Sequence, residues 1–190
     1  MPEVFLIMEL CLIFVDKCLK ANFMKTIPTN IRRKLDKEIA SIIKTVSSRN
    51  DNISISKENT TFSNFFLDRM LMIQVIRVGV PYSFFYLIQL YSPFSENDWS
   101  NILAISTKSL QRYKQGAKNF KSTQSEKIIE MAEVTNIGLD VFGSMEKFKL
   151  WLDTPNFALG KCKPIGLLTD SYGKEMVVGE LTRINYGILA

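Results

Sequence analysis

The side chains best suited to chemistry form a basic cluster in residues 106–121, where five cations occur without an acidic residue: Lys108, Arg112, Lys114, Lys118 and Lys121. Cations at this density, with hydroxyl and amide side chains among them, can hold the phosphates of a nucleic acid. The solvent-facing side of an ordinary helical bundle can carry the same composition. Charge alone therefore does not distinguish a DNA-binding helix from a solvated one.

Few residues in the chain fit a catalytic site. The sequence has no histidine, which excludes Ser-His-Asp and Cys-His catalysis and any zinc site that needs an imidazole. Tyr172 with Lys174 or Asp170 could form an acid–base group, but these positions fit better as a helix start with a buried aromatic ring. We therefore expect no enzymatic activity, no metal and no cofactor.

The cysteines predict neither a metal site nor a disulfide framework, because no CxxC spacing joins any two of Cys11, Cys18 and Cys162. This usage is typical of a reduced, cytoplasmic protein. The net charge of +5 permits an acidic partner. The apolar segment 4–15 is shorter than the roughly 20 residues that span a membrane, and no positive leader precedes it. We expect a helix that packs on the fold, or sequence upstream of a start at Met24, rather than membrane attachment.

The elements that must position these side chains are predicted to be helices. Residues 31–46 have helical spacing of apolar side chains on one stripe, formed by Ile31, Leu35, Ile39, Ile42, Ile43 and Val46. A polar linker follows in residues 47–61, and a second apolar helix is expected over residues 64–77. Pro81 fits the first turn of the next, aromatic-rich helix. No strand alternation persists after Phe65, so the fold class is all-α.

Two short helices joined by a tight turn are expected in residues 95–116. Ser95 can cap the first helix with Asp98 three residues later, and Ser106 can cap the second, which ends at Gly116. This arrangement predicts a helix-turn-helix whose second helix enters the major groove of DNA. The candidate DNA-binding residues are Ser106, Thr107, Lys108, Gln111, Arg112, Lys114 and Lys118.

The C-terminal third predicts a long helix from residue 122 to 142, a second helix over residues 144–152, and a corner that Pro155 and Gly160 fix. Pro164 begins a short helix. A last helix is expected over residues 171–185. Its buried face is predicted to carry Tyr172, Met176, Val177, Leu181 and Ile184, and its exposed side Lys174, Glu175, Glu180 and Arg183.

Residues 148–190, FKLWLDTPNFALGKCKPIGLLTDSYGKEMVVGELTRINYGILA, closely resemble the toxin-binding domain of Xre/MbcA/ParS-type antitoxins. The shared pattern is a Trp-Leu helix end, a Thr-Pro-Asn corner, Ala-Leu-Gly, a Pro-x-x-Leu-Leu turn, a following glycine, and a closing Leu-x-Arg-Ile-x-x-Gly. Upstream, VIRVGVPYSFF and ISTKSLQRYKQG look like the Xre-type helix-turn-helix, so the resemblance covers about residues 71–190. Two departures are Arg112-Tyr113, where the family often has paired arginines, and Lys161, where glycine is common.

The resemblance implies a partner toxin, usually a RES-domain protein that consumes NAD. It also implies that the C-terminal helix and tail cover the toxin's active site, and that the antitoxin represses its own operon by binding operator DNA. The candidate toxin-binding residues are Arg183, Asn185, Tyr186, Gly187, Ile188, Leu189 and Ala190.

The expected domains are an N-terminal extension with a polar linker (residues 1–63), a helix-turn-helix domain (64–121) and a toxin-binding domain (122–190). We expect a homodimer within a larger complex with the toxin, because helix-turn-helix units usually bind two half-sites. The alternative is a helix-turn-helix transcriptional regulator without a toxin partner, whose C-terminal unit serves for dimerisation.

Overall fold

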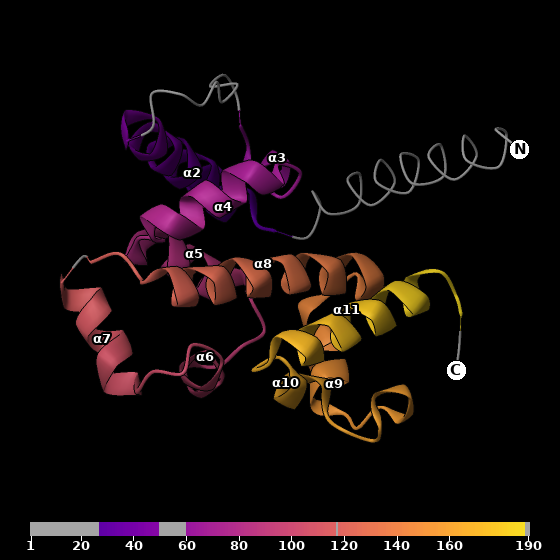
Figure 1. Ribbon diagram of the computed structural model, residues 1–190. Coiled ribbons are helices and arrows are strands. Elements are labelled where there is room, and N and C mark those ends of the chain that lie inside the picture. Colours follow the sequence, from indigo (N-terminus) through magenta and orange to yellow (C-terminus); the bar gives the residue numbers. More distant parts are fainter. Residues whose placement is uncertain (1–26, 50–59, 117, 189–190) are drawn as a thin grey trace, which may run out of the picture.

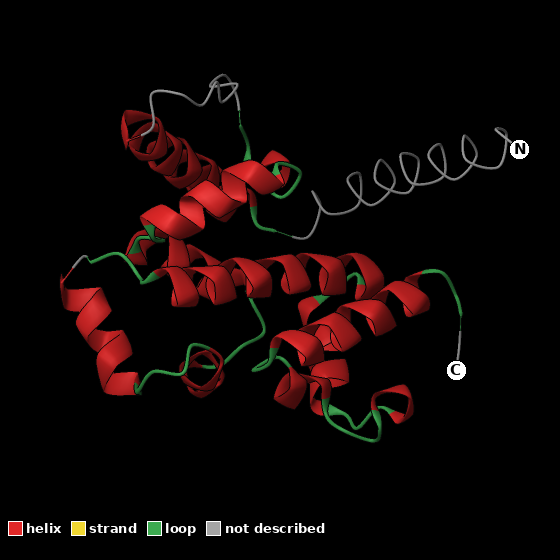
Figure 2. Cartoon of the chain, viewed as in Figure 1, coloured by secondary structure: helices red, strands yellow, loops and turns green. Residues whose placement is uncertain are grey.

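The computed structural model describes residues 27–49, 60–116 and 118–188 of the chain. Throughout these residues the secondary structure is helical and contains no strand, which confirms the all-α prediction (Figure 2). The apolar segment 4–15, Met24, most of the predicted linker, Leu189 and Ala190 lie outside the described residues.

The helices follow one another in the order α2 (Thr29–Arg49), α3 (Phe62–Phe65), α4 (Arg69–Val78), α5 (Tyr82–Tyr91), α6 (Glu96–Ile102), α7 (Thr107–Gly116), α8 (Ser122–Phe142), α9 (Met145–Asp153), the 3₁₀ helix η1 (Phe157–Leu159), α10 (Pro164–Leu167) and α11 (Ser171–Asn185). Figure 1 shows α8 as the central helix. The helices α2 to α5 lie on one side of it, α9 to α11 lie on the other, and α7 stands beyond its N-terminal end.

The first half of the chain packs α2 against α3, α4 and α5. The predicted stripe on α2 faces this core: Leu35, Ile39 and Val46 are buried, whereas Ile31 is partly exposed. The carboxylate of Asp36 accepts a hydrogen bond from the backbone N–H of Phe62 at 2.7 Å, which ties α3 to α2. The predicted domain boundary after residue 63 separates α2 from α4 and α5, although these helices share one core. The boundary stays a prediction.

The helix predicted over residues 64–77 is wrong in one respect, since the structure divides it into α3 and α4. The break lies at residues 66–68, and Asp68 begins the second helix. Its side chain accepts a hydrogen bond from the backbone N–H of Leu71 at 2.9 Å. An N-cap aspartate satisfies one of the free amides at a helix start, so this side chain favours a new helix over a continuous one.

Helix α8 joins the two halves, because it contacts α4 and α5 on one side and α9 and α11 on the other. It ends at Gly143, whose φ of +68° is the left-handed conformation that glycine adopts readily. Ser144 then caps α9, accepting a hydrogen bond from the backbone N–H of Lys147 at 3.3 Å. These two residues turn the chain so that α9 packs back on α8.

Helix α11 has the predicted bounds, and the predicted burial of Val177 and Leu181 is confirmed, but the predicted burial of Tyr172 and Met176 is wrong. The buried side carries Gly173, Val177, Glu180 and Leu181. Tyr172 is 84% exposed and Met176 is 50% exposed. Gly173 explains the difference, since a Cβ on it would lie 2.1 Å from the carbonyl oxygen of Leu167. This close approach of α10 places the face through Gly173 toward the core and directs the side chain of Tyr172 to solvent.

Candidate functional site

The helices α6 and α7 form two contacting helices joined by a four-residue turn, residues 103–106. The capping box predicted for α6 is present: Ser95 Oγ accepts the Asp98 N–H at 3.2 Å, and Asp98 Oδ2 accepts the Ser95 N–H at 2.8 Å. In the turn, Ala104 has a φ of +51°. Ser106 Oγ accepts the backbone N–H of Ser109 at 3.1 Å. The local signals in the sequence therefore produce two short capped helices joined by a short turn, and their assignment as a DNA-binding helix-turn-helix stays a prediction.

Helix α7 is attached to the fold through its apolar side. Leu110 is buried, and the ring of Tyr113 stacks on Phe120 with centroids 4.2 Å apart. Phe120 in turn donates its backbone N–H to the carbonyl of Val80 at 2.8 Å. At Gly79, φ is +90° and a Cβ would lie 2.4 Å from the carbonyl oxygen of Phe120. The turn between α4 and α5 thus fixes the segment that leads out of α7.

All seven candidate DNA-binding residues are exposed, but they do not share one direction. At 100° per residue, Lys108 and Arg112 lie on the side of α7 opposite the buried Leu110. Gln111 and Lys114 instead line a pocket that Tyr86 of α5 also borders. The hydroxyl of Ser106 caps the N-terminus of α7 by accepting the Ser109 N–H. Lys108 and Arg112 are therefore the cations best placed to reach a nucleic acid outside the molecule.

The C-terminal end of α11 is closed by a well-defined hydrogen-bonded turn. The N–H of Gly187 donates to the carbonyl of Ile184 at 2.9 Å, and the N–H of Ile188 donates to the carbonyl of Arg183 at 3.0 Å. With φ of +69° at Gly187, these two bonds form a Schellman motif. Gly187 therefore supplies the left-handed backbone conformation that the motif needs, and the motif fixes the direction in which the chain leaves α11.

The candidate toxin-binding residues among the described ones are all on the surface. Tyr186 is 53% exposed and Ile188 is 55% exposed. Arg183 forms an ion pair with Glu180 at 3.6 Å, although the sequence predicted Glu180 to be exposed. The Glu180 side chain is only 10% exposed in this pair, so it holds the guanidinium of Arg183 near the surface of α11.

Comparison with known proteins identifies the region that contains this helix. Residues 138–187 match the family model of the antitoxin Xre/MbcA/ParS C-terminal toxin-binding domain. This part of the chain is similar to that domain family. The family resemblance read from the sequence is thereby confirmed.

Two known proteins are also similar to this chain. Antitoxin Xre from Photorhabdus laumondii subsp. laumondii is 27% identical over 117 residues, which are 61% of this chain and 79% of that protein. Among solved structures, the chain is similar to one in the M. tuberculosis MbcT-MbcA toxin-antitoxin complex. That likeness has a TM-score of 0.46 and 19% sequence identity, and covers 56% of this chain and 94% of that chain.

The Thr-Pro-Asn corner at residues 154–156 is held by local hydrogen bonds. Thr154 donates its hydroxyl to the carbonyl of Leu150 at 2.7 Å, and Asn156 Oδ1 accepts the N–H of Ala158 at 2.8 Å. Gly160 has a φ of +67°. Lys161 also has a positive φ, +61°. Residues 160 and 161 therefore both adopt the left-handed backbone region, which Gly160 reaches more easily than Lys161 does.

Sequence reasoning missed several exposed apolar residues in the segment 138–187. Phe157 in η1 is 78% exposed and lies under the ammonium of Lys161 at 5.8 Å, and Leu150 of α9 is 69% exposed. Tyr172 and Met176 belong to the same set. Gly173, Val177 and Leu181 follow one another at a spacing of four residues. This spacing is the signal in the sequence from which the exposure of Tyr172 and Met176 could have been predicted.

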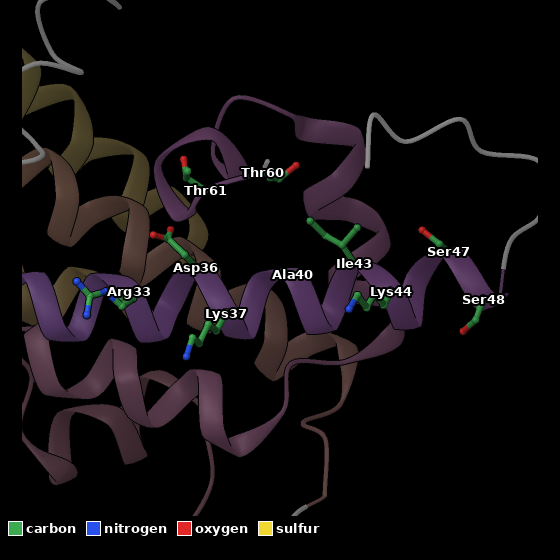
Figure 3. Close-up of a pocket in the computed structure, with 10 residues that line it drawn as sticks. All are labelled: Arg33, Asp36, Lys37, Ala40, Ile43, Lys44, Ser47, Ser48, Thr60 and Thr61. Carbon is green, nitrogen blue, oxygen red and sulfur yellow. The ribbon is translucent and has the colours of Figure 1, made fainter. Parts of the chain in front are cut away.

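A pocket of about 730 Å³ lies between α2 and residues 60–61, in the other half of the chain (Figure 3). Arg33, Lys37 and Lys44 line it, but Lys37 points away from Thr60 and Thr61 (Figure 3). The cations therefore do not converge on one point as a phosphate site would require.

In the described residues there is no group of His, Cys, Asp and Glu that could hold a metal ion. None of the helices described is long and apolar enough to cross a membrane.

Proposed function

We propose that this chain is the antitoxin of a toxin–antitoxin pair and that it neutralises its toxin with the C-terminal end of α11 and the residues after it. The observation that supports this proposal is the family match over residues 138–187, which contains all of α11. The relative named Antitoxin Xre extends the likeness well beyond that domain. A non-enzymatic, binding role agrees with a chain that has no histidine.

The chemistry of the α11 end suits occlusion of a pocket in another protein. The Schellman motif directs the tail, so less conformational entropy has to be lost when it docks. Tyr186 and Ile188 supply exposed apolar surface beside a cation, Arg183. A toxin carboxylate could take the place of Glu180 as the partner of that guanidinium. The family resemblance makes the expected toxin a RES-domain protein that consumes NAD, and the tail would cover its active site.

We further propose that α7 binds operator DNA and that the chain represses its own operon. Its support is the exposure of Lys108 and Arg112 on the outer side of α7, with the capped turn that precedes them. Lys114 and Lys118 would contact phosphates and so determine the salt dependence of binding. A homodimer would place two α7 helices on two half-sites of one operator.

A pair of variants tests both activities in one experiment. Deleting residues 187–190 should abolish protection against the toxin in a growth assay but leave DNA binding unchanged. Replacing Lys108 and Arg112 together with alanine should weaken operator binding by about tenfold or more, because each lost base contact is worth about 1–3 kcal/mol. Protection should persist in that variant. Each variant is therefore the control for the other.

The results also separate the two candidate functions. Full protection by the deletion variant would remove the tail from the mechanism. Wild-type operator affinity of the double variant in a mobility-shift titration would place the DNA contact elsewhere. If the intact chain binds DNA but forms no complex with the product of the adjacent reading frame, a transcriptional regulator without a toxin partner is the correct function.

A further inference from the structure

A pocket of about 560 Å³ lies between α5 and α7, beside the start of α6. Its volume falls within the range of about 300–1,000 Å³ that is typical of small-molecule sites. Apart from Leu110, every side chain that lines it carries a polar group: they belong to two tyrosines, three glutamines, one glutamate and one lysine. Flat rings, amides and charges of both signs therefore surround one volume, as in a site that orients a polar ligand.

The wall of this pocket on α5 is the end of a series of near-parallel aromatic rings. Tyr113 stacks on Phe120, with an angle of 19° between the ring planes. Phe120 stacks on Tyr82 at 23°, with centroids 6.5 Å apart. Tyr82 stacks on Tyr86 at 20°, with centroids 6.4 Å apart. Tyr86 ends the series and is 44% exposed, so a planar ring from a ligand can continue the stacking there.

The polar groups beside Tyr86 are available to a ligand. In the part of the chain that the structure describes, no hydrogen bond or ion pair joins the side chain of Glu96, Gln111 or Lys114 to another residue. A glutamine amide presents a donor next to an acceptor, which matches the edge of a nucleobase, and a carboxylate accepts from a base amino group. Lysine is a common ligand of phosphate.

We propose that this pocket binds a purine nucleoside monophosphate, with its base stacked on Tyr86 and its phosphate held by Lys114. Aromatic stacking combined with hydrogen bonds to the base edge is how proteins hold unpaired bases. Gln111 would bond the base edge, because it lines the same pocket. A purine is favoured because its larger ring system stacks over more of the tyrosine. The nucleotide and operator DNA would compete for Lys114, but the site depends on neither proposed function.

Isothermal titration calorimetry on the full-length chain tests the proposal, with AMP as the probe because glutamine forms paired hydrogen bonds with adenine. The wild type should bind AMP with a Kd below about 1 mM. Tyr86→Leu should weaken binding by about tenfold or more, because it removes the stacking ring. Tyr86→Phe keeps the ring and should bind within about threefold of wild type. Tyr172→Leu is the matched control, since Tyr172 is an exposed tyrosine on α11, away from this pocket.

A second comparison tests the phosphate contact. Adenosine has no phosphate and should bind the wild type more weakly than AMP does. Lys114→Gln removes the cation, so this variant should bind AMP and adenosine with affinities within about twofold of each other. The comparison uses two ligands on one protein, and it therefore decides the question if Tyr86→Leu lowers the thermal midpoint of the chain.

Weaker AMP binding by Tyr86→Leu, with wild-type binding by Tyr172→Leu and an unchanged thermal midpoint, would support the proposal. AMP binding by Tyr86→Leu within about twofold of wild type would overturn it, and so would a wild-type Kd above about 1 mM. Equal affinity for AMP and ribose 5-phosphate would also overturn it, because the base would then not be recognised. An equal loss of binding in Tyr172→Leu would place the nucleotide outside this pocket and have the same consequence.

Discussion

Replacing Gly138 with alanine tests how α8 and α9 pack against each other. The new Cβ would lie 2.3, 2.4 and 2.5 Å from three ring carbons of Phe148. Nonbonded carbon atoms are most stable about 3.5–4.0 Å apart, so the ring would have to move by about 1 Å or more. Phe148 is fully buried between Phe142 and Trp151, with ring centroids 6.1 and 6.3 Å away.

The sign of the effect follows from two opposing terms. Alanine in place of glycine stabilises a helix interior by about 0.5–1 kcal/mol. Overpacking a close-packed core costs about 1–3 kcal/mol, and the upper end applies when the displaced ring cannot find another rotamer. We therefore expect Gly138→Ala to lower the free energy of unfolding by about 1–2 kcal/mol. In a chain of this size, that corresponds to a fall in Tm of about 2–8 °C.

Urea denaturation of four proteins measures this effect: wild type, Gly138→Ala, Phe148→Leu and the double variant. If the clash with the ring is the cause, Gly138→Ala should be neutral or stabilising in the Phe148→Leu background, which has no ring. The cycle should then give a coupling energy of about 1 kcal/mol or more. A Gly138→Ala protein as stable as wild type would refute the packing argument, and so would a destabilisation of equal size in both backgrounds.

Two further predictions concern buried polar groups on α8. Ser125 Oγ is buried, accepts a hydrogen bond from the Val80 N–H at 2.9 Å and donates one to the Phe120 carbonyl. Ser125→Ala should therefore lower the free energy of unfolding by about 1–3 kcal/mol in urea denaturation. An unchanged urea midpoint would contradict this role. Burial raises the pKa of Asp140 from 3.8 to about 7. Because the folded state then holds a proton that the unfolded state has lost, stability should fall as pH rises from about 4 to 7. Asp140→Asn should flatten this part of the stability–pH curve, and an identical curve would contradict the assignment.

Local signals in the sequence determined most helix ends. Ser95 with Asp98, Ser106 and Ser144 each act as the caps that their residue types predict, and glycine at position 143 closes α8. These contacts join residues a few positions apart, so their geometry does not depend on the rest of the fold. The two short helices α6 and α7 and the bounds of α11 could be predicted for the same reason.

The side that each helix buries was decided by tertiary structure. In α11 the spacing of Tyr172 and Met176 fits a buried face as well as that of Gly173 and Val177, because adjacent lines on a helix differ by only about 100°. The close approach of Leu167 to Gly173 selected the second line and left the aromatic ring in solvent. Asp36 likewise holds the start of α3 across 26 residues of sequence, a contact that no local pattern predicts. The sequence by itself determined most helix ends, whereas packing between the helices determined the start of α3 and which surfaces remain for partners.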